Sequence, residues 1–343
     1  MGLFSFFTKE LAIDLGTANT LIIQDGKVVV DQPSIVAIDR RTNQTIAVGK
    51  RAMMMHEKTH ENIKTIRPLK DGVIADFQAA ESMIEGMIKM VGNKRSFFSS
   101  LKMVICIPSG ITEVEKRAVF DSADNVNSKE TYLIYEPMAA ALGIGLDVEE
   151  PEGNMIIDIG GGTTEIAVIA LSGIVADQSI RIAGDEMTGD IISFLKQEHN
   201  ILIGERTAEQ IKINVGAAIT DLENPPEKYA VNGRDLMTGI PRQIFTTHLE
   251  IAEALDKSIS KIEDGVLKAL EMTPPELASD IFRRGLYLTG GGALLRGIDK
   301  RLSAKTKLPV TIVDDPLRAV VRGTGIALKN IDKYTFLIDR KSV

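Results

Sequence analysis

The chain has 343 residues, which is enough for about two domains. Its composition is that of an ordinary globular protein, with 44% hydrophobic residues, 25% charged residues and no tryptophan. The net charge of -7 argues against a protein whose main task is to neutralise nucleic-acid phosphates, and no apolar stretch approaches the roughly 20 residues that cross a bilayer.

Two Phe-containing segments stand out from this background. The pair Phe97 and Phe98 lies in a polar, basic stretch, where two aromatic side chains are not expected to be plain solvent surface. The N-terminal segment carries several bulky apolar residues, and a helix this short is marginal in water. The segment could therefore be an interfacial membrane anchor or could pack on the surface of its own domain. The bulky residues of that segment fall on one side of a helical wheel: Leu3, Phe4, Phe6 and Phe7.

The first half of the chain alternates short strands and helices. Thr112 with Glu115 three residues later has the spacing of a capping box, and Pro137 is placed to start a helix. The only cysteine, Cys106, lies in an apolar strand and is expected to be a buried, reduced thiol, which favours a cytoplasmic location. Strands are predicted at 10–14, 20–24, 27–30, 101–107 and 131–135, and helices at 51–62, 77–91 and 112–123.

The second half restarts in the same way. Strands that alternate with helices indicate an α/β fold, and its sheets should be mixed because a hairpin opens each half. A further hairpin is predicted to turn at Asn232-Gly233, and a helix is predicted to open at Thr207. Strands are predicted at 154–158, 165–170, 286–289 and 308–313, and helices at 184–198, 207–215, 247–272 and 319–330.

An internal repeat links the two halves. Residues 11–23 and 155–167 each form an apolar strand that ends in Asp, then one apolar residue, a glycine, a small polar turn and a second apolar strand. The two aspartates, Asp14 and Asp158, are 144 positions apart (158 − 14), which is close to half the chain. One such hairpin would be weak evidence because Asp and Gly are ordinary turn formers, but two in equivalent places indicate a shared function.

The repeat predicts a polyphosphate site. Glycine lets successive N–H groups converge on an anion, and hydroxyl groups supply further donors from Thr17, Thr20, Thr163 and Thr164. Two facing hairpins would hold a polyphosphate from both sides in a cleft, with Asp14 and Asp158 directed at its Mg²⁺. The sequence contains neither the P-loop motif nor the dinucleotide-binding motif, so other nucleotide folds are disfavoured.

These residues resemble the phosphate-binding signatures of the actin, sugar-kinase and heat-shock-chaperone ATPase superfamily. Within it, the segments 14–20, 136–141, 158–165, 204–209 and 288–295 are similar to the MreB family of bacterial actins, in the same order over essentially the whole chain. The resemblance implies an actin-like fold of two similar lobes with mixed sheets, each with a small inserted subdomain. The implied subdomains are IA (1–32, 71–147 and 320–343), IB (33–70), IIA (148–181 and 242–319) and IIB (182–241).

The resemblance also implies ATP and Mg²⁺ as cofactors and assigns residue roles. Asp14 and Asp158 hold Mg²⁺ through water, and Glu136, aided by Thr164, positions the attacking water. Read alone, Glu136 could equally be a helix N-terminal carboxylate stabilised by the dipole. The implied ATP-binding residues are Gly16, Thr17, Ala18, Asn19, Gly160, Gly161, Gly162, Thr163, Glu209, Gln210, Ile211, Lys212, Gly290, Gly291, Gly292, Ala293 and Leu294.

The implied function is an ATP-dependent, filament-forming cytoskeletal ATPase on the inner face of the cytoplasmic membrane, which organises cell-wall synthesis and sets cell shape. Its expected partners are itself, in paired protofilaments, the membrane surface, and cell-shape and wall-synthesis membrane proteins, with no nucleic acid. Membrane contact is assigned to the N-terminal bulky residues and to Phe97 and Phe98. A chaperone ATPase lacks room for a peptide-binding domain after the last predicted helix. A small-molecule kinase is disfavoured because the inserts are short.

Overall fold

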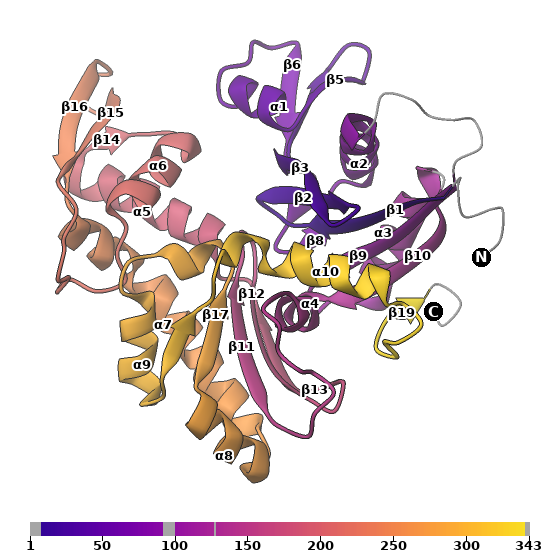
Figure 1. Ribbon diagram of the computed structural model, residues 1–343. Coiled ribbons are helices and arrows are strands. Elements are labelled where there is room, and N and C mark those ends of the chain that lie inside the picture. Colours follow the sequence, from indigo (N-terminus) through magenta and orange to yellow (C-terminus); the bar gives the residue numbers. More distant parts are fainter. Residues whose placement is uncertain (1–7, 92–99, 127, 340–343) are drawn as a thin grey trace. The chain divides into compact units, whose positions relative to one another are not determined.

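A computed structural model describes residues 8–91, 100–126 and 128–339 of the chain (Figure 1). The chain forms two compact units. Unit 1 comprises Met1–Glu152, Ile169–Val175 and Leu317–Val343, and unit 2 comprises Gly153–Val168 and Ala176–Pro316. The predicted α/β class with mixed sheets is confirmed. The finer division into four subdomains stays a prediction.

The main sheet of unit 1 has the strand order β19-β10-β9-β1-β2-β3. Strand β9 runs parallel to both β1 and β10, whereas β2, β3 and β19 pair antiparallel with their neighbours. The register aligns Asp14 with Cys106 and Cys106 with Ile134, so three parallel strands end at one edge of the sheet. The strands are β1 (Thr8–Leu15), β2 (Asn19–Gln24), β3 (Lys27–Pro33), β9 (Ser100–Ile107), β10 (Ser128–Tyr135) and β19 (Ile338–Asp339).

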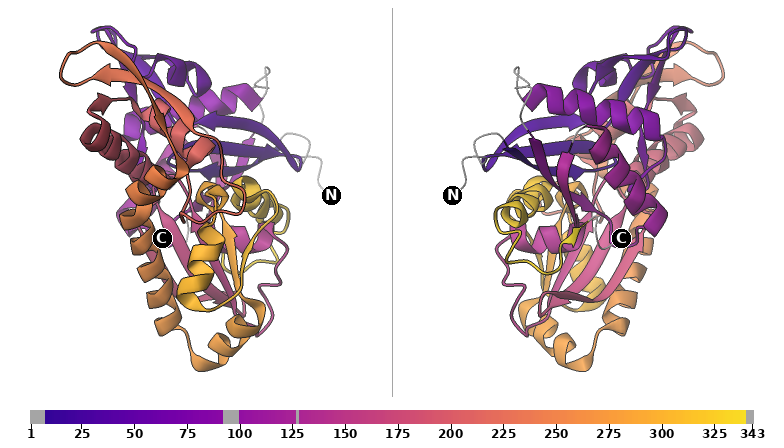
Figure 2. Two further views of the ribbon diagram at one scale, coloured as in Figure 1. Left: turned by 90° about the vertical axis from the view of Figure 1, so that its left-hand side faces the viewer. Right: turned by 90° about the vertical axis from the view of Figure 1, so that its right-hand side faces the viewer.

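Helices cover both faces of this sheet, with α2 and α3 on one face and α4 and α10 on the other (Figures 1 and 2). The predicted capping box at the start of α3 is confirmed. The Thr112 hydroxyl accepts a hydrogen bond from the Glu115 N–H, and the Glu115 carboxylate accepts one from the Thr112 N–H. The helices are α2 (Phe77–Val91), α3 (Glu113–Asn125), α4 (Glu136–Gly143) and α10 (Ala319–Lys329).

Helices α4 and α10 touch backbone to backbone. A Cβ atom built on Gly323 would lie 1.7 Å from the carbonyl oxygen of Ala139, and one on Gly143 would lie 1.8 Å from that of Ala319. Any side chain at either glycine would therefore force the two helices apart. This contact fixes α4, whose first residue is Glu136, against the body of unit 1.

The remaining elements of unit 1 form a smaller sheet, β5-β4-β6, with one short helix and the β7–β8 hairpin. The predicted helix 51–62 is wrong beyond residue 55, because His56 is extended and Glu57 takes a left-handed φ of 60°. The His56 ring nitrogen Nδ1 instead lies 2.9 Å from the Thr65 hydroxyl in β6. The elements are β4 (Val36–Asp39), β5 (Gln44–Val48), α1 (Lys50–Met55), β6 (Ile63–Ile66), β7 (Leu69–Lys70) and β8 (Val73–Ile74).

The main sheet of unit 2 has the order β13-β12-β11-β17-β18. Strands β11, β17 and β18 are parallel, and the register places Asp158 beside Thr289. The predicted strand 308–313 is shorter than expected, since only its middle three residues pair as β18. The strands are β11 (Asn154–Ile159), β12 (Thr164–Ala170), β13 (Gly173–Ile180), β17 (Leu286–Thr289) and β18 (Val310–Ile312).

Five α-helices of unit 2 enclose its core. The helix predicted to open at Thr207 begins two residues earlier, after Gly204 as its N-cap. In α8, the Asp280 carboxylate accepts hydrogen bonds from the Gly153 N–H at 2.9 Å and from the Arg283 guanidinium, and these donors lower the pKa of Asp280. The helices are α5 (Gly184–His199), α6 (Glu205–Val215), α7 (His248–Met272), α8 (Pro275–Arg284) and α9 (Ile298–Thr306).

A three-stranded sheet, β14-β15-β16, completes unit 2. The predicted hairpin is present as β15 and β16, but its turn does not lie at Asn232-Gly233, because both residues lie inside β15 and pair with Gln243 and Arg242 of β16. Gly233 is needed for close approach instead, since a Cβ there would lie 2.6 Å from the Leu202 carbonyl oxygen in β14. The chain turns between the two strands, at residues 236–240. The strands are β14 (Ile201–Leu202), β15 (Tyr229–Asp235) and β16 (Pro241–Thr246).

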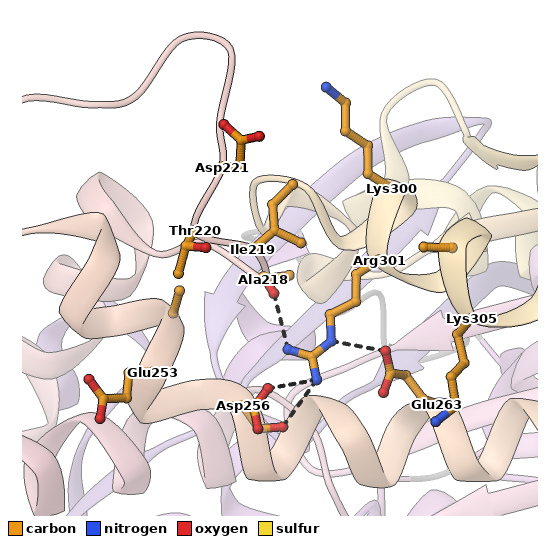
Figure 3. A pocket seen from close by; sticks show the side chains of 12 residues that line it. Ala218, Ile219, Thr220, Asp221, Glu253, Asp256, Glu263, Lys300, Arg301 and Lys305 are labelled. Atoms are coloured by element: carbon orange, nitrogen blue, oxygen red, sulfur yellow. Dashed lines mark hydrogen bonds and ion pairs between the residues drawn. The ribbon is translucent and has the colours of Figure 1, made fainter.

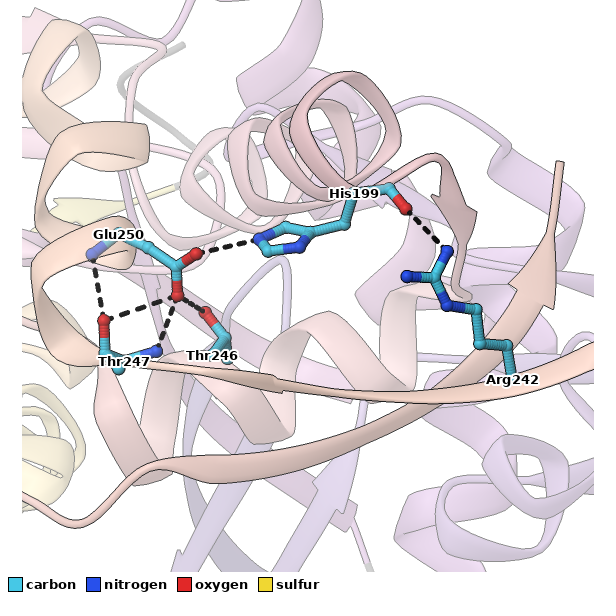
Figure 4. A network of polar contacts seen from close by, with 5 residues as sticks. All are labelled: His199, Arg242, Thr246, Thr247 and Glu250. Atoms are coloured by element: carbon cyan, nitrogen blue, oxygen red, sulfur yellow. Dashed lines mark hydrogen bonds and ion pairs between the residues drawn. The ribbon is translucent and has the colours of Figure 1, made fainter.

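A polar network joins the end of α5 to the start of α7 (Figure 4). The Glu250 carboxylate accepts hydrogen bonds from the N–H of Thr247 at 2.9 Å and the hydroxyl of Thr246 at 3.1 Å, and its Oε1 lies 2.8 Å from His199 Nε2. Burial alone would raise the pKa of Glu250, but these hydrogen bonds outweigh it and the pKa is lowered. The network therefore favours a charged carboxylate at the α7 N-terminus, where the helix dipole also stabilises it.

Candidate functional site

The first cluster of predicted site residues lies at the carboxyl edge of the main sheet of unit 1. Asp14 stands near the end of β1, Cys106 near the end of β9, and Glu136 directly after β10. The Cys106 thiol donates a hydrogen bond to Asp14 Oδ1 at 3.2 Å. The prediction of a buried, free thiol is confirmed, but its contact with Asp14 was not predicted.

Burial sets the protonation of these two groups. It raises the pKa of Asp14 to about 6, although the hydrogen bond from Cys106 works in the opposite direction. Burial also raises the pKa of the Cys106 thiol well above its usual value, and the carboxylates of Asp14 and Glu136 raise it further. Cys106 is therefore a neutral donor to Asp14, and negative charge at this edge comes from carboxylates. A cation bound here would favour the charged form of Asp14.

The loop 16–19 follows β1 in a tight turn. A Cβ on Gly16 would lie 2.7 Å from the carbonyl oxygen of Asn19, so only glycine permits this turn without displacement of the backbone. The Thr17 hydroxyl accepts a hydrogen bond from the Gly72 N–H at 2.9 Å. Thr17 keeps its own hydroxyl proton for a further acceptor, as the phosphate prediction requires.

Glu136 was expected to end the strand without helical geometry, because it precedes Pro137, but the strand ends one residue earlier and Glu136 is helical. Tyr135 before it is extended, with φ −70° and ψ 137°, and Glu136 begins α4 with Pro137 in its first turn. The side chain is half-buried and belongs to the same sheet edge as Asp14. The structure thus brings the predicted catalytic carboxylate and one predicted Mg²⁺ carboxylate together within unit 1, while the role of Glu136 stays a prediction.

The second cluster lies at the carboxyl edge of the main sheet of unit 2. Asp158 is 5% exposed and precedes a loop that is closed by a hydrogen bond from the Gly160 N–H to the Thr163 carbonyl oxygen at 2.9 Å. The first turn of α5 caps this loop, because the Gly184 N–H donates to the Gly160 carbonyl oxygen at 3.1 Å. The Thr164 hydroxyl donates to the Ile182 carbonyl oxygen at 2.6 Å.

The glycine run after β17 packs directly against Asp158. Gly290 has a φ of 81°, and a Cβ there would lie 2.3 Å from the Ile159 carbonyl oxygen and 2.4 Å from Asp158 Oδ1. A short 3-10 helix, η2 (Gly291–Leu294), follows, in which Ala293 is buried and Leu294 is 55% exposed. Gly290, one of the predicted ATP-binding residues, therefore lies beside the second aspartate.

Of the four ATP-binding residues predicted on α6, Glu209 and Lys212 contact the start of α5, whose first turn caps the loop of the second cluster. Lys212 Nζ donates to the Gly184 carbonyl oxygen at 2.7 Å and forms an ion pair with Glu209 at 2.7 Å. Ile211 is fully buried in the core of unit 2, and Gln210 is exposed. The helical repeat explains this division, since residues three apart share a face and their immediate neighbours do not.

The donor set fits Mg²⁺ only together with a phosphate ligand. Within the part of the chain that the structure describes, no group of three or more His, Cys, Asp or Glu side chains could hold a metal ion by itself. Each cluster contributes one carboxylate near a glycine loop, Asp14 or Asp158. Mg²⁺ is usually bound by one or two carboxylates, phosphate oxygens and retained water, so these residues fit an ion that arrives with a nucleotide.

A separate hollow of about 860 Å³ in unit 2 is lined by none of the predicted site residues (Figure 3). Its central charges already pair with one another. The Arg301 guanidinium donates to Glu263 at 2.9 Å and lies 2.9 Å from Asp256, and Lys300 lies 2.7 Å from Glu223. The two ion pairs of Arg301 tie α9 to α7, and the pair of Lys300 ties α9 to the loop that contains Glu223.

The predicted membrane residues cannot be placed. Leu3, Phe4, Phe6 and Phe7, like Phe97 and Phe98, lie outside the described residues. Among the residues that are described, none of the helices combines the length and the apolar character that a membrane span requires.

Comparison with known proteins identifies the family to which the chain is similar. The sequence pattern of the family described as MreB/Mbl protein matches residues 8–335. The chain is 45% identical over 328 residues to the cell shape-determining protein Mbl of Bacillus subtilis, with 95% of this chain and 98% of Mbl covered. It is 47% identical over 333 residues to the cell shape-determining protein MreB of Escherichia coli K12, with 96% and 95% covered.

A solved structure gives the same result for the fold. MreB 5 of Spiroplasma citri bound to AMPPNP matches with a TM-score of 0.90 and 39% identity, over 95% of this chain and 97% of that chain. The predicted actin-like fold and the predicted family are both confirmed. The chain belongs to the MreB/Mbl family of actin-like, cell shape-determining proteins.

Proposed function

We propose that this protein is an ATPase that binds Mg-ATP through its glycine hairpins and couples its hydrolysis to filament assembly and disassembly. The observation that carries the proposal is the pair of matched glycine hairpins, each led by an aspartate at the carboxyl ends of the parallel strands of a mixed sheet. Such strand ends are where open α/β sheets bind ligands. A relative that is 39% identical was solved bound to AMPPNP, which supports ATP as the nucleotide.

Each cluster has a distinct part in binding. The N–H groups of loops 16–19 and 160–163 bind phosphate oxygens, and the hydroxyls of Thr17 and Thr163 add donors. Glu209 and Lys212 contact the ribose and base, and residues 290–294 lie against the base and α-phosphate, where glycines allow close approach. When bound, Mg²⁺ neutralises phosphate charge and orients the terminal phosphate, and Asp14 and Asp158 hold it through water.

Hydrolysis is assigned to Glu136. Its carboxylate accepts a hydrogen bond from the attacking water and orients that water toward the terminal phosphate. Positioning of this kind supplies most of what phosphoryl transfer requires of a protein. Thr164 assists through its hydroxyl oxygen, which can still accept a hydrogen bond while its proton is donated to Ile182.

The test compares Glu136→Gln with the wild type in nucleotide binding and phosphate release. Binding of Mg-ATP should be retained, whereas phosphate release should fall by about 100-fold or more. Glu113→Gln is the matched control, since Glu113 is a largely exposed carboxylate in the first turn of the neighbouring helix α3. Unchanged turnover in Glu136→Gln would remove Glu136 from the mechanism, and a wild type that binds no Mg-ATP would refute the proposal.

The proposed assembly is a homopolymer of paired protofilaments, supported by membership of an actin-like family of cell shape-determining proteins. Sedimentation and electron microscopy, with and without Mg-ATP and lipid, test it directly. Filaments that require Mg-ATP would support the proposal. Persistent monomers that phosphorylate a sugar would replace it with a small-molecule kinase.

The proposed location is the inner face of the cytoplasmic membrane, where the filaments organise cell-wall synthesis together with membrane proteins of that process. The support is the apolar side of the N-terminal segment and the aromatic pair Phe97-Phe98. Liposome co-sedimentation should fall when Phe4, Phe6 and Phe7 are changed to Ser. If that variant and a Phe97/Phe98 double substitution both co-sediment with liposomes as fully as the wild type, the membrane proposal is refuted.

A further inference from the structure

The loop 16–19 is held from outside its own hairpin by Ser34, a residue that no motif in the sequence marks. Ser34 follows β3 and is 1% exposed. Its hydroxyl donates to the Gly16 carbonyl oxygen at 2.6 Å, and its N–H donates to the Ala18 carbonyl oxygen at 2.9 Å. One buried serine therefore binds two carbonyl groups of the same loop.

A third contact extends this arrangement. Ser34 Oγ lies 2.9 Å from the hydroxyl oxygen of Thr20, which is 1% exposed. Because the single Ser34 hydroxyl proton is given to Gly16, Thr20 must be the donor to Ser34. The result is a buried chain from Thr20 through Ser34 to Gly16, in which each hydrogen bond polarises the next.

Because the peptide group is planar, these contacts also determine the direction in which the loop N–H groups point. In a trans peptide, the C=O of one residue and the N–H of the next point in opposite directions. The carbonyl groups of Gly16 and Ala18 both point to Ser34, so the N–H groups of Thr17 and Asn19 point away from it. Backbone N–H groups turned to a common side form an anion-binding concavity.

We propose that Ser34 is a positioning residue that directs the Thr17 and Asn19 N–H groups toward a bound phosphate. This inference rests on the proposed function, since it assumes that the loop binds a nucleotide. The hydroxyl of Ser34 fixes the peptide that contains the Thr17 N–H, and the backbone of Ser34 fixes the peptide that contains the Asn19 N–H. Replacement of the side chain alone should therefore loosen one of the two donors.

The experiment measures the affinity of the full-length Ser34→Ala variant for Mg-AMPPNP and for adenosine, which has no phosphate. Loss of one hydrogen bond is worth ~1 kcal/mol, so the affinity for Mg-AMPPNP should fall about five-fold. The affinity for adenosine should not change. The ratio of the two affinities isolates the phosphate contact from any general loss of stability.

Ser122→Ala is the matched control. Ser122 is also fully buried in unit 1, and its hydroxyl also donates to a backbone carbonyl oxygen, that of Ala118 at 2.8 Å. It should lose comparable stability while both affinities stay at the wild-type value. Equal affinities in Ser34→Ala and the wild type, or an equal loss for both ligands, would overturn the positioning role. A wild type that does not bind Mg-AMPPNP would remove the proposed function itself, and this inference with it.

Discussion

The backbone contact between α4 and α10 makes Gly323→Ala an informative substitution. In an ordinary helix interior, replacing glycine with alanine stabilises a protein by about 1 kcal/mol. Here the new Cβ would lie 1.7 Å from the Ala139 carbonyl oxygen, whereas an ordinary contact is at least 3.4 Å. The helices would have to separate by about 1.7 Å, the difference between these distances, and overpacking of this kind costs ~1–3 kcal/mol or more.

Gly325→Ala on the same helix is the matched control. The nearest atom to its new Cβ would be a methyl carbon of Ile23 at 3.5 Å, an ordinary van der Waals contact. This variant should be as stable as the wild type or slightly more stable. In urea denaturation followed by circular dichroism, Gly323→Ala should unfold at a midpoint about 1 M below that of Gly325→Ala, for a difference of ~3 kcal/mol.

The same substitution should affect turnover. Glu136 is the first residue of α4, so a displaced helix displaces its carboxylate, and a misplacement of about 1 Å can cost about 100-fold in rate. Phosphate release by Gly323→Ala should therefore fall well below that of Gly325→Ala at a temperature where both are folded. Equal urea midpoints for the two variants would refute the close helix contact, and with it the reasoning about turnover.

Three further predictions concern stability. Arg301→Ala should lower the free energy of unfolding by ~3 kcal/mol, because it leaves the buried Glu263 carboxylate without its partner. Lys300→Ala breaks an exposed pair and should cost less than about 1 kcal/mol. Similar losses in the two variants would contradict the difference between the buried and the exposed pair. Thr112→Ala should cost ~1 kcal/mol through loss of the N-cap, and an unchanged midpoint would show that the cap contributes nothing. The pKa of Asp280 is lowered on folding, so its charged form stabilises the protein above the ordinary pKa, and this contribution is lost as the pH falls through the lower folded pKa. Asp280→Asn should therefore be less stable than the wild type at pH 7 and approach the stability of the wild type in acid. A stability difference that stays constant across pH would refute this.

Local signals in the sequence predicted the elements that carry the proposed chemistry. The capping box at Thr112 was correct because it depends only on two residues that are three positions apart in the chain. The strands that end at Asp14 and Asp158 were correct because apolar runs closed by turn residues are typical of buried strands in α/β proteins.

The errors arose where tertiary contacts decided the structure. The helix predicted over residues 51–62 stops early because His56 leaves the helical conformation and bonds with β6. Asn232-Gly233 is a strong turn signal, but Gly233 serves the close approach of a neighbouring strand. In both cases a contact with another strand outweighs the local preference.

The support of the candidate site could not be predicted for the same reason. Cys106 is 92 residues from Asp14, and Ser34 is 18 residues from Gly16, so no local spacing signals either hydrogen bond. On α6, Ile211 stays a predicted ATP-binding residue, and the structure adds that its side chain lies in the core of unit 2.

The division of the chain also has a consequence for how the protein is made. Unit 2 is built almost entirely from residues 153–316, whereas unit 1 needs both ends of the chain. During synthesis, β1, β9 and α4 leave the ribosome long before α10, which packs against all three. The face of the nascent sheet that α10 covers stays open while some 170 later residues are translated, about 10–30 s at typical bacterial rates. A chain whose synthesis ends before α10 would thus expose apolar surface and be a natural substrate for chaperones and proteases.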